Sequence, residues 1–387
     1  MHFELSEEQK QLQSTIHDFA QAEIAPVAED LDRKGAFPVE LFQKLGEMGV
    51  QSIPFPEDLG GMGLGVFEAV LAIEALARAD QSIAVSAMVS MASGLTVARF
   101  GTEEQKRRWL PEIVSGQKIC SIAGTEPDAG SDTGGFRTRA TQLGNGQWSL
   151  SGEKAYITNA GTPISLFTLI LAISSPPEAE RKKFTLFLTP NDAPGYTRGK
   201  GYDKMGWRSS DTRQLYLDDC QLGEEAIVGE LHGGRHLLHK GYQAARIWLA
   251  ACSLGLAQAS LDHALAYAKE RRAFGGTLGQ KQMIQQMIAE MALKVETARL
   301  VTYRAAWQID QGIDDIGALS MAKLHATEVG SEVANMALQV HGGWGFMNDC
   351  PPSRYLRDNR ICTIGDGSSQ IQTLLIARAL GLDVDFT

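Results

Sequence analysis

The chain lacks the features of a disulfide-stabilised protein and of a membrane protein. Its 387 residues include five cysteines, an odd number, and no two of them form a C-x-x-C pair. This usage is typical of reduced thiols in a cytosolic protein. No uninterrupted run of about 18 apolar residues occurs, so no membrane span is expected. The first residues, MHFELSEEQKQ, are polar and acidic and have no apolar signal core. We therefore expect a cytoplasmic protein.

The chain also lacks an excess of positive charge and several common catalytic motifs. The formal net charge of −10 argues against nucleic-acid binding, which needs clustered Lys and Arg to neutralise phosphates. Neither G-x-G-x-x-G nor G-x-S-x-G occurs, so neither a dinucleotide fingerprint nor a serine-hydrolase elbow is predicted. His232, His236 and His239 lie close together, but no Cys, Asp or Glu completes a zinc motif around them. We interpret them as a solvated helix start and expect no metal site.

The overall composition of the chain is that of a globular protein with a large core. Hydrophobic residues make up 44% of the chain and charged residues 21%, which is ordinary for a soluble protein. The length predicts two or three structural units. Up to about residue 116 the pattern is helical, with capping boxes at Ser6–Gln9 and Thr102–Gln105 and a helix opening near Pro38. The apolar residues of SAMVSMASGL are interpreted as core.

The period of the pattern changes twice along the chain. From about residue 118 to 229, short β-branched and aromatic runs such as FTLILAIS and KFTLFLTP alternate with Gly, Pro, Asn and Asp, which predicts a small antiparallel β domain. After Gly229 three long amphipathic helices follow, over about 235–275, 282–312 and 316–343. Helices of this length need partners on both flanks, so a bundle with subunit packing on its outer face is expected.

Two short loops carry polar groups that could serve a ligand. TEPDAGSD, residues 125–132, crowds hydroxyls and carboxylates around small residues where the β domain begins. Gly365-Asp366-Gly367-Ser368 places one carboxylate between two glycines. Taken alone, each is more often only a loop or a turn.

Six motifs change this interpretation, because they occur together in one order. They are TEPDAGSD (125–132), GEKAYITNAG (152–161), KMGWRSSDTRQLYLDD (204–219), ERRAFG (270–275), QVHGGWGF (339–346) and RYLRDNRICTIGDGSSQIQ (354–372). Their order and spacing resemble the acyl-CoA dehydrogenase family along nearly the whole chain. The resemblance implies a mostly α protein with a central β domain. The expected parts are an N-terminal α-helical domain (1–117), a small antiparallel β-barrel domain (118–229) and a C-terminal four-helix bundle (230–387).

The resemblance also implies FAD as cofactor and a homotetramer in which two subunits share each FAD. In the chain's own β domain, the residues implied in cofactor binding are Ile122, Gly124, Thr125, Gly130, Ser131, Tyr156, Ile157 and Thr158. Tyr156 would stack on the ring, and Thr158 would offer its hydroxyl to the reactive nitrogen. A neighbouring subunit would supply Arg271, Phe274, Gln282, Gln339 and Gly343. Two alternatives remain open: a helix-end cation for Arg271 and a C-cap for Gly343.

The same resemblance implies a site for the acyl-CoA substrate. The implied substrate residues are Ser131, Tyr242, Gln243, Arg246 and Gly367, and Gly367, Ser368 and Gln370 would also touch the cofactor. The family commonly has an acid where Gln243 stands, so that contact is expected to differ. Some members carry their catalytic glutamate just before the arginine. This chain has Ala245 there, so no alternative base is available at that position.

The catalytic base implied by the resemblance is Asp366, because the family places a glutamate in a Tyr-Glu-Gly-Thr motif at this point. A carboxylate is needed to remove the α-proton of the thioester while the β-hydrogen leaves as hydride. Aspartate has roughly 1.3–1.5 Å less reach, and a misplacement of about 1 Å can cost on the order of a hundredfold in rate. Gly365 also removes the bulk of the family tyrosine, although Trp344 could refill that space. We therefore expect a branched or alicyclic acyl-CoA, as in cyclohexanecarboxyl-CoA dehydrogenases, which resemble this chain in using an aspartate.

Three other functions stay open from the sequence alone. One is a dehydrogenase of straight short- or medium-chain acyl-CoA. The second is a flavin oxidase of the nitroalkane-oxidase type, which also uses an aspartate base. The third is a non-catalytic acyl-CoA-binding subunit. The resemblance to the dehydrogenases further implies electron-transfer flavoprotein as the electron acceptor.

Overall fold

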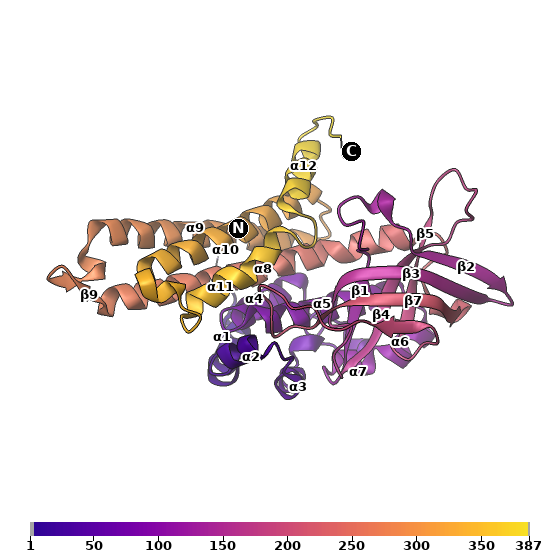
Figure 1. The fold of residues 1–387 in the computed structure, drawn as a ribbon, viewed down its shortest axis with the longest axis horizontal. Helices are drawn as coiled ribbons and strands as arrows, with labels where there is room; N and C mark the ends of the chain where they lie inside the picture. The colour runs from indigo at the N-terminus through magenta and orange to yellow at the C-terminus, as the bar shows by residue number, and fades with distance from the viewer. Residues whose placement is uncertain (1–3, 386–387) are drawn as a thin grey trace.

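The computed structural model describes residues 4–385. The first three residues of the polar amino-terminal segment and the last two residues of the chain lie outside the described part. The chain begins with a helical layer, continues through one large sheet, and ends in long helices (Figure 1). The helices of the first layer are α1 (Glu7–Phe19), α2 (Ala28–Lys34), α3 (Val39–Glu47), α4 (Val66–Ala77), α5 (Gln81–Phe100), α6 (Glu103–Trp109) and α7 (Pro111–Val114).

The predicted helix starts of this layer are confirmed. Ser6 and Gln9 form a reciprocal capping box at the start of α1, and Thr102 and Gln105 form another at α6. Pro38 is the N-cap residue of α3. A π-helical segment, Ala20–Ile24, continues α1 toward Pro26. Helix α2 was not anticipated from the sequence.

The middle of the chain forms one eight-stranded sheet. Its strands are β1 (Ile119–Ala123), β2 (Arg139–Gly144), β3 (Gln147–Thr158), β4 (Ser165–Ile173), β5 (Phe184–Pro190), β6 (Tyr196–Arg198), β7 (Thr212–Gly223) and β8 (Ile227–Val228). The hydrogen-bonded order is β6-β7-β3-β2-β4-β5-β8, with β1 paired to β4. Most neighbours run antiparallel, as expected. However, β1 pairs with β4 in parallel, and β2 meets β4 in parallel at Arg139, which the alternation of residues could not show.

The third part of the chain is built on the three predicted long helices. They are α8 (Gly234–Glu270), α9 (Gln282–Asp310) and α10 (Ile316–His341), followed by the shorter α11 (Pro351–Asn359) and α12 (Ser369–Ala379). A small hairpin, β9 (Arg272–Ala273) and β10 (Gly276–Thr277), joins α8 to α9. It lies at the end of the molecule opposite the sheet, and α12 projects away from the helices (Figure 1).

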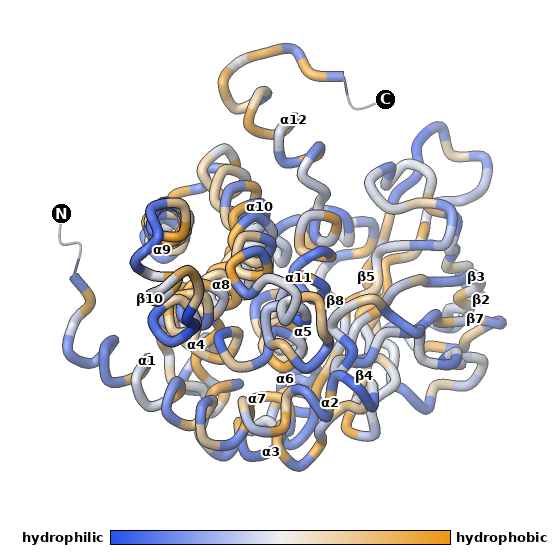
Figure 2. Tube along the Cα trace, turned by 60° about the vertical axis from the view of Figure 1, so that its left-hand side comes forward, coloured by the Kyte–Doolittle hydropathy of each residue, from blue (hydrophilic) through white to orange (hydrophobic). Residues whose placement is uncertain are grey.

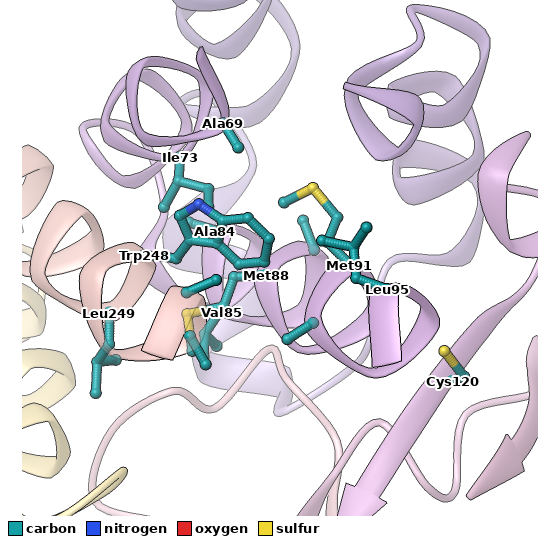
Figure 3. Close-up of a cluster of buried hydrophobic side chains, with 14 of the residues drawn as sticks. Ala69, Ile73, Ala84, Val85, Met88, Met91, Leu95, Cys120, Trp248 and Leu249 are labelled. Carbon is teal, nitrogen blue, oxygen red and sulfur yellow. The ribbon is translucent and has the colours of Figure 1, made fainter. Parts of the chain in front are cut away.

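The hydrophobic core lies where α4 and α5 pack against α8. Figure 2 shows hydrophobic positions concentrated along α4 and α8, whereas α1 is largely hydrophilic. In Figure 3, Met88 and Met91 of α5 lie beside Trp248 of α8, and all three side chains are buried. The interpretation of the SAMVSMASGL residues as core is therefore confirmed for both methionines.

Two helices of the described chain are apolar enough to resemble membrane spans by length and composition. They are α5 (Gln81–Phe100) and α8 (Gly234–Glu270). However, 72% and 89% of the apolar 18-residue segment of each helix lie buried inside the protein. Burial of this extent is what the core helices of a globular domain show. Composition alone is thus weak evidence for a span.

A buried ion network joins the three parts of the chain. Arg354 of α11 donates from Nη1 to Asp80 Oδ2 (3.0 Å) and from Nη2 to the carbonyl of Ala79 (3.0 Å). Asp358 accepts a hydrogen bond of 2.7 Å from the backbone N–H of Trp207, which precedes β7. Both carboxylates are buried, and burial raises the pKa of each. A single guanidinium therefore lies near two carboxylates that carry a large desolvation cost.

Replacing Arg354 with methionine should strongly destabilise the protein. The change leaves two buried carboxylates without their cation, and breaking a buried pair in this way typically costs about 3–5 kcal/mol. Arg33→Met is the matched control, because Arg33 also pairs with two acids, Glu29 and Asp349, but is 57% exposed. Its loss should cost no more than about 1 kcal/mol. Thermal unfolding followed by circular dichroism compares the two, and equal melting temperatures would contradict the role given to Arg354.

Candidate active site

Asp366 lies in a tight turn between a 3₁₀ segment (Arg360–Thr363) and α12. Its φ is +52°, in the left-handed region, and Gly367 follows with φ +90°. A non-glycine residue in this region is strained, although aspartate tolerates it better than most residues. Gln372 Nε2 holds the turn by donating to the carbonyls of Asp366 (3.2 Å) and Gly367 (3.1 Å). Ser368 then caps α12 through the N–H of Ile371.

Two cations from different helices act on this carboxyl group. Burial raises the pKa of Asp366 above its ordinary value, and the positive charges of Lys323 on α10 and Arg246 on α8 oppose that rise. Lys323 also donates from Nζ to the carbonyl of Gly367 at 2.8 Å. Arg246 is buried, yet its Nε and Nη1 atoms have no hydrogen-bond partner among the described residues. An arginine left with free buried donors beside a carboxylate is typical of a ligand site.

A recess accompanies the base because position 365 carries no side chain. A Cβ built on Gly365 would approach only one atom, the carbonyl oxygen of Ile361 at 3.6 Å, among the described residues. Trp344, which could refill that space, has no atom within 4 Å of this Cβ position. Trp344 is half exposed and lies in a 3₁₀ segment beyond the carboxyl end of α10, whereas Lys323 lies in the first third of that helix. The position next to the Gly365 backbone, where a side chain would begin, is therefore free among the described residues.

The loop at the start of the β domain reaches the same helix as Arg246. A Cβ on Gly124 would lie 3.4 Å from the hydroxyl of Tyr242 and 3.3 Å from Leu238. Tyr242 in turn faces Asp366, whose charge contributes to the raised pKa of the tyrosine after the larger effect of burial. Gly124 and Tyr242 therefore link the loop to the base. Along this loop Ile122 and Thr125 are half-buried, and Gly130 and Ser131 are exposed.

Lys154 on β3 holds this loop in place, a role that was not predicted from the sequence. Its side chain is fully buried and donates from Nζ to the carbonyl of Gly124 (2.9 Å) and to Glu126 Oε1 (2.9 Å). Burial lowers the pKa of Lys154 to about 8. Burial would raise the pKa of Glu126, but Lys154 and the backbone N–H of Arg137 hold it below its ordinary value. Glu126 is thus a structural member of TEPDAGSD.

The end of β3 presents an aromatic ring to the surface. Tyr156 has φ +62° and is 63% exposed, and its ring lies 5.4 Å from that of Tyr202. Ile157 is buried and Thr158 is half-buried. A rigid strand that holds an exposed aromatic ring in a strained conformation is suited to stacking on a planar group.

The remaining predicted cofactor residues do not meet Asp366 within one chain. Arg271, Phe274, Gln282, Gln339 and Gly343 are all exposed and lie at the end of the bundle away from the sheet. The stacked rings of Tyr267 and His341, 4.4 Å apart, bring the carboxyl ends of α8 and α10 together there. Arg246 and Arg271 are 25 residues apart along α8, which corresponds to roughly 37 Å of helix. The predicted residues therefore form two groups, one near Asp366 and the sheet and the other at the far end of the helical bundle. We call each group a half-site.

Three further residues that the sequence singled out, Gln243, His232 and Gln370, have the following surroundings. Gln243 donates to Asp314 Oδ1 at 2.7 Å, and Lys240 pairs with the same carboxylate. The amide of Gln243 is thus engaged by the turn between α9 and α10. His232 accepts or donates a bond to Ser174 (2.8 Å), and no group of three metal-ligating residues occurs between residues 4 and 385. Gln370 is exposed at the start of α12.

Comparison with known proteins accounts for all three parts of the chain. Acyl-CoA dehydrogenase models match as the N-terminal domain over residues 6–117, the middle domain over 121–220 and the C-terminal domain over 232–381. The chain belongs to the acyl-CoA dehydrogenase family. It therefore has the fold of that family and is an FAD-dependent oxidoreductase.

Three similar proteins illustrate this relationship. The mitochondrial short-chain specific acyl-CoA dehydrogenase of Mus musculus is 39% identical over 375 residues, which cover 97% of this chain and 90% of that protein. The butyryl-CoA dehydrogenase structure of Megasphaera elsdenii has a TM-score of 0.94 at 32% identity and covers 98% of this chain and 100% of that chain. A structure of the electron transferring flavoprotein of Acidaminococcus fermentans has a TM-score of 0.95 at 34% identity, with 99% and 100% covered.

The residues present fit the FAD that the family uses. Tyr156 offers an exposed ring, and the loop at Gly124 is held by Lys154 and lies against Tyr242. In this chain, Ile122, Gly124, Thr125, Tyr156 and Thr158 would hold FAD on the side of the sheet.

Replacing Lys154 with methionine should weaken FAD binding without contact between the lysine and the cofactor. The change frees the carbonyl of Gly124 and leaves Glu126 as a buried charge, so the loop should lose its fixed conformation. The measurement is the ratio of bound FAD to protein after gel filtration, with the melting temperature as a second reading. Lys182→Met is the control, because exposed Lys182 donates to the carbonyls of Gly134 (2.7 Å) and Phe136 (2.9 Å) nearby. Full FAD content in the Lys154 variant would refute this role.

Proposed function

We propose that this acyl-CoA dehydrogenase uses Asp366 as the base that removes the α-proton of an acyl-CoA thioester. The observation that carries the proposal is the position of Asp366 in a fixed turn, between Lys323 and an arginine with free donors, Arg246. Burial raises the pKa of Asp366, so its carboxylate holds a proton more tightly than that of an ordinary aspartate, which suits a general base. FAD, when bound, supplies the acceptor for the hydride that leaves Cβ.

The protein's own residues bind the thioester and position it for proton transfer. Tyr242 and Arg246 on α8 line the approach to Asp366, and the backbone of Asp366 would hold the thioester oxygen so that charge developing on it is stabilised. Gly367 would allow the substrate to come close to the main chain. Ser131, on the exposed loop, would contact the portion of the substrate nearer to the solvent. Each assignment is part of the proposal.

Asp366→Asn should abolish dehydrogenation while leaving FAD and substrate binding in place. The amide keeps the size of the side chain but cannot accept the α-proton, so the rate should fall by a factor of about 10²–10⁴. Anaerobic bleaching of the flavin by a panel of acyl-CoAs measures this reaction. The wild-type rate should fall as the pH drops through the raised pKa of Asp366, because only the ionised form is a base.

Three outcomes would overturn the proposal. Bleaching by the asparagine variant at the parental rate would exclude Asp366 as the base. Oxygen consumption with nitroethane, without bleaching by any acyl-CoA, would instead indicate a nitroalkane oxidase. A yellow wild-type protein that binds acyl-CoA and is never bleached would indicate a non-catalytic subunit.

We further propose that the acyl group is branched or alicyclic. This rests on Gly365, whose missing side chain leaves space beside Asp366, and on the shorter reach of aspartate, which suits a substrate that is thick at Cα. The alternative is a straight short- or medium-chain acyl group; the Mus musculus relative is named short-chain specific and the Megasphaera elsdenii protein is named butyryl-CoA dehydrogenase.

Gly365→Tyr should therefore change the preference for the acyl group. The ring would occupy the recess, so kcat/KM for cyclohexanecarboxyl-CoA should fall by at least about tenfold relative to butyryl-CoA. Octanoyl-CoA serves as the straight-chain control for length. A wild-type preference for butyryl- or octanoyl-CoA over the alicyclic substrate would defeat this part of the proposal.

The two half-sites support a homotetramer with shared cofactors. Arg271, Phe274, Gln282, Gln339 and Gly343 lie at the far end of the bundle, so they would complete the FAD site of a neighbouring copy. Electron-transfer flavoprotein is proposed as the electron acceptor and the cytoplasm as the location.

A further inference from the structure

A lysine that the expected site does not include lies directly behind the turn of Asp366. Lys323 is on α10 and its side chain is fully buried, among the largest fully buried side chains of the described chain. Its Nζ atom donates to the carbonyl of Gly367 at 2.8 Å. Burying an ammonium group is costly unless it is paired. Its surroundings therefore have to offset that cost.

The charge that offsets this cost is that of Asp366. Burial lowers the pKa of Lys323, and the charge of Asp366 is the largest influence that opposes this fall, ahead of Cys362. The influence is mutual, because Lys323 is the largest influence that counteracts the raised pKa of Asp366, ahead of Arg246. The lysine and the base thus stabilise each other's ionised forms.

Among the described residues, the same lysine is one of two side chains that donate to the carbonyls of Asp366 and Gly367. Asp366 and Gly367 both have positive φ, a conformation that persists only when the surroundings fix it. Gln372 supplies neutral hydrogen bonds to both carbonyls, and Lys323 supplies a charged hydrogen bond to the second. Charge-assisted hydrogen bonds are roughly twice as strong as neutral ones.

We propose that Lys323 is a positioning residue for the base: its ammonium group holds the turn through the carbonyl of Gly367 and places a buried positive charge beside the carboxylate of Asp366. This inference rests on the proposed role of Asp366. Lys323 touches neither reacting carbon and transfers no proton. It keeps the base ionised and directed toward the substrate.

The charges around Asp366 determine what the loss of Lys323 would do. The charge of Asp366 acts on Tyr242, Arg246 and Cys252 of α8, and on Cys362 of the 3₁₀ segment before the turn. On α10, Glu328 acts on Lys323 itself. Without the lysine, Arg246 remains as the cation beside the base, so protonation of Asp366 should persist to higher pH.

The test is the pH dependence of anaerobic flavin bleaching by an acyl-CoA in two variants of the holoenzyme. In Lys323→Met, the pH range over which the rate falls on acidification (the acid limb of the rate profile) should shift to higher pH by on the order of one unit. The plateau rate should fall by at least about tenfold, because the turn loses a support. Lys323→Gln keeps a hydrogen-bond donor without the charge. It should show the same shift of the limb and a smaller loss of plateau rate.

Lys204→Met is the matched control for the loss of a lysine with several hydrogen bonds. Lys204 donates to the carbonyl and hydroxyl of Ser210 (2.8 Å each) and to Thr212 (2.9 Å), and burial lowers its pKa to about 8. Lys204 belongs to the segment before β7. The rate of the Lys204→Met variant should therefore fall on acidification over the same pH range as that of the parental enzyme. FAD content and melting temperature show whether each variant is folded. If Lys323→Met is not folded, the result for Lys323→Gln decides whether Lys323 has the proposed role.

The outcomes separate this inference from the proposed function. If wild-type protein is bleached and Asp366→Asn is inert, but a folded Lys323 variant keeps the parental limb and plateau, the inference is overturned and the base stands. If Asp366→Asn is bleached like the wild type, both are overturned. An equal shift of the limb in Lys204→Met would also refute a specific role for Lys323.

Discussion

The contact between Arg354 and two buried carboxylates is the constraint from which the geometry of the site follows. Asp80 belongs to the junction of α4 and α5, Asp358 receives the N–H of Trp207 from the β domain, and Arg354 itself belongs to α11. All three parts of the chain are therefore fixed to one another at this point. The turn of Asp366 begins only a few residues after α11, so its distance from α5, α8 and the sheet is set by this network.

The second constraint is the length of α8. This helix carries Tyr242 and Arg246 near its beginning and Arg271 directly after its end. One continuous helix cannot bring both ends to the same small molecule. The absence of a dinucleotide fingerprint is consistent with this arrangement, because the predicted cofactor residues are spread over a loop, a strand end and the far end of a bundle instead of one βα turn.

Much of the fold could be predicted from residue patterns, because helix periodicity and capping are local. The bounds of α8, α9 and α10 lie close to those expected, and both capping boxes are present. The parallel pairing of β1 with β4 could not be predicted, since side-chain alternation does not encode strand direction. The hairpin β9–β10 is too short for a pattern to reveal.

The candidate site was only partly predictable, for a related reason. Asp366 and Arg246 were found through motifs, but the positive φ of Asp366 depends on Lys323 and Gln372, which are distant or unremarkable in sequence. One signal for Lys323 was present: Leu319, Ala322 and Ala326 place it on the apolar face of α10, where a lysine needs a partner. Lys154 was overlooked in the same way, because its partners Gly124 and Glu126 lie in the loop after β1, about 30 residues earlier in the chain.

The division of the predicted residues into two half-sites has a genetic consequence in the assembly proposed above. Each polypeptide would contribute its base to one catalytic centre and its bundle tip to the next. A chain with a substitution at Asp366 and a chain with a substitution at Arg271 would then be defective in different half-sites. A mixed oligomer would contain some catalytic centres built from the intact half-site of each chain. Alleles that are inactive separately would complement each other when expressed together.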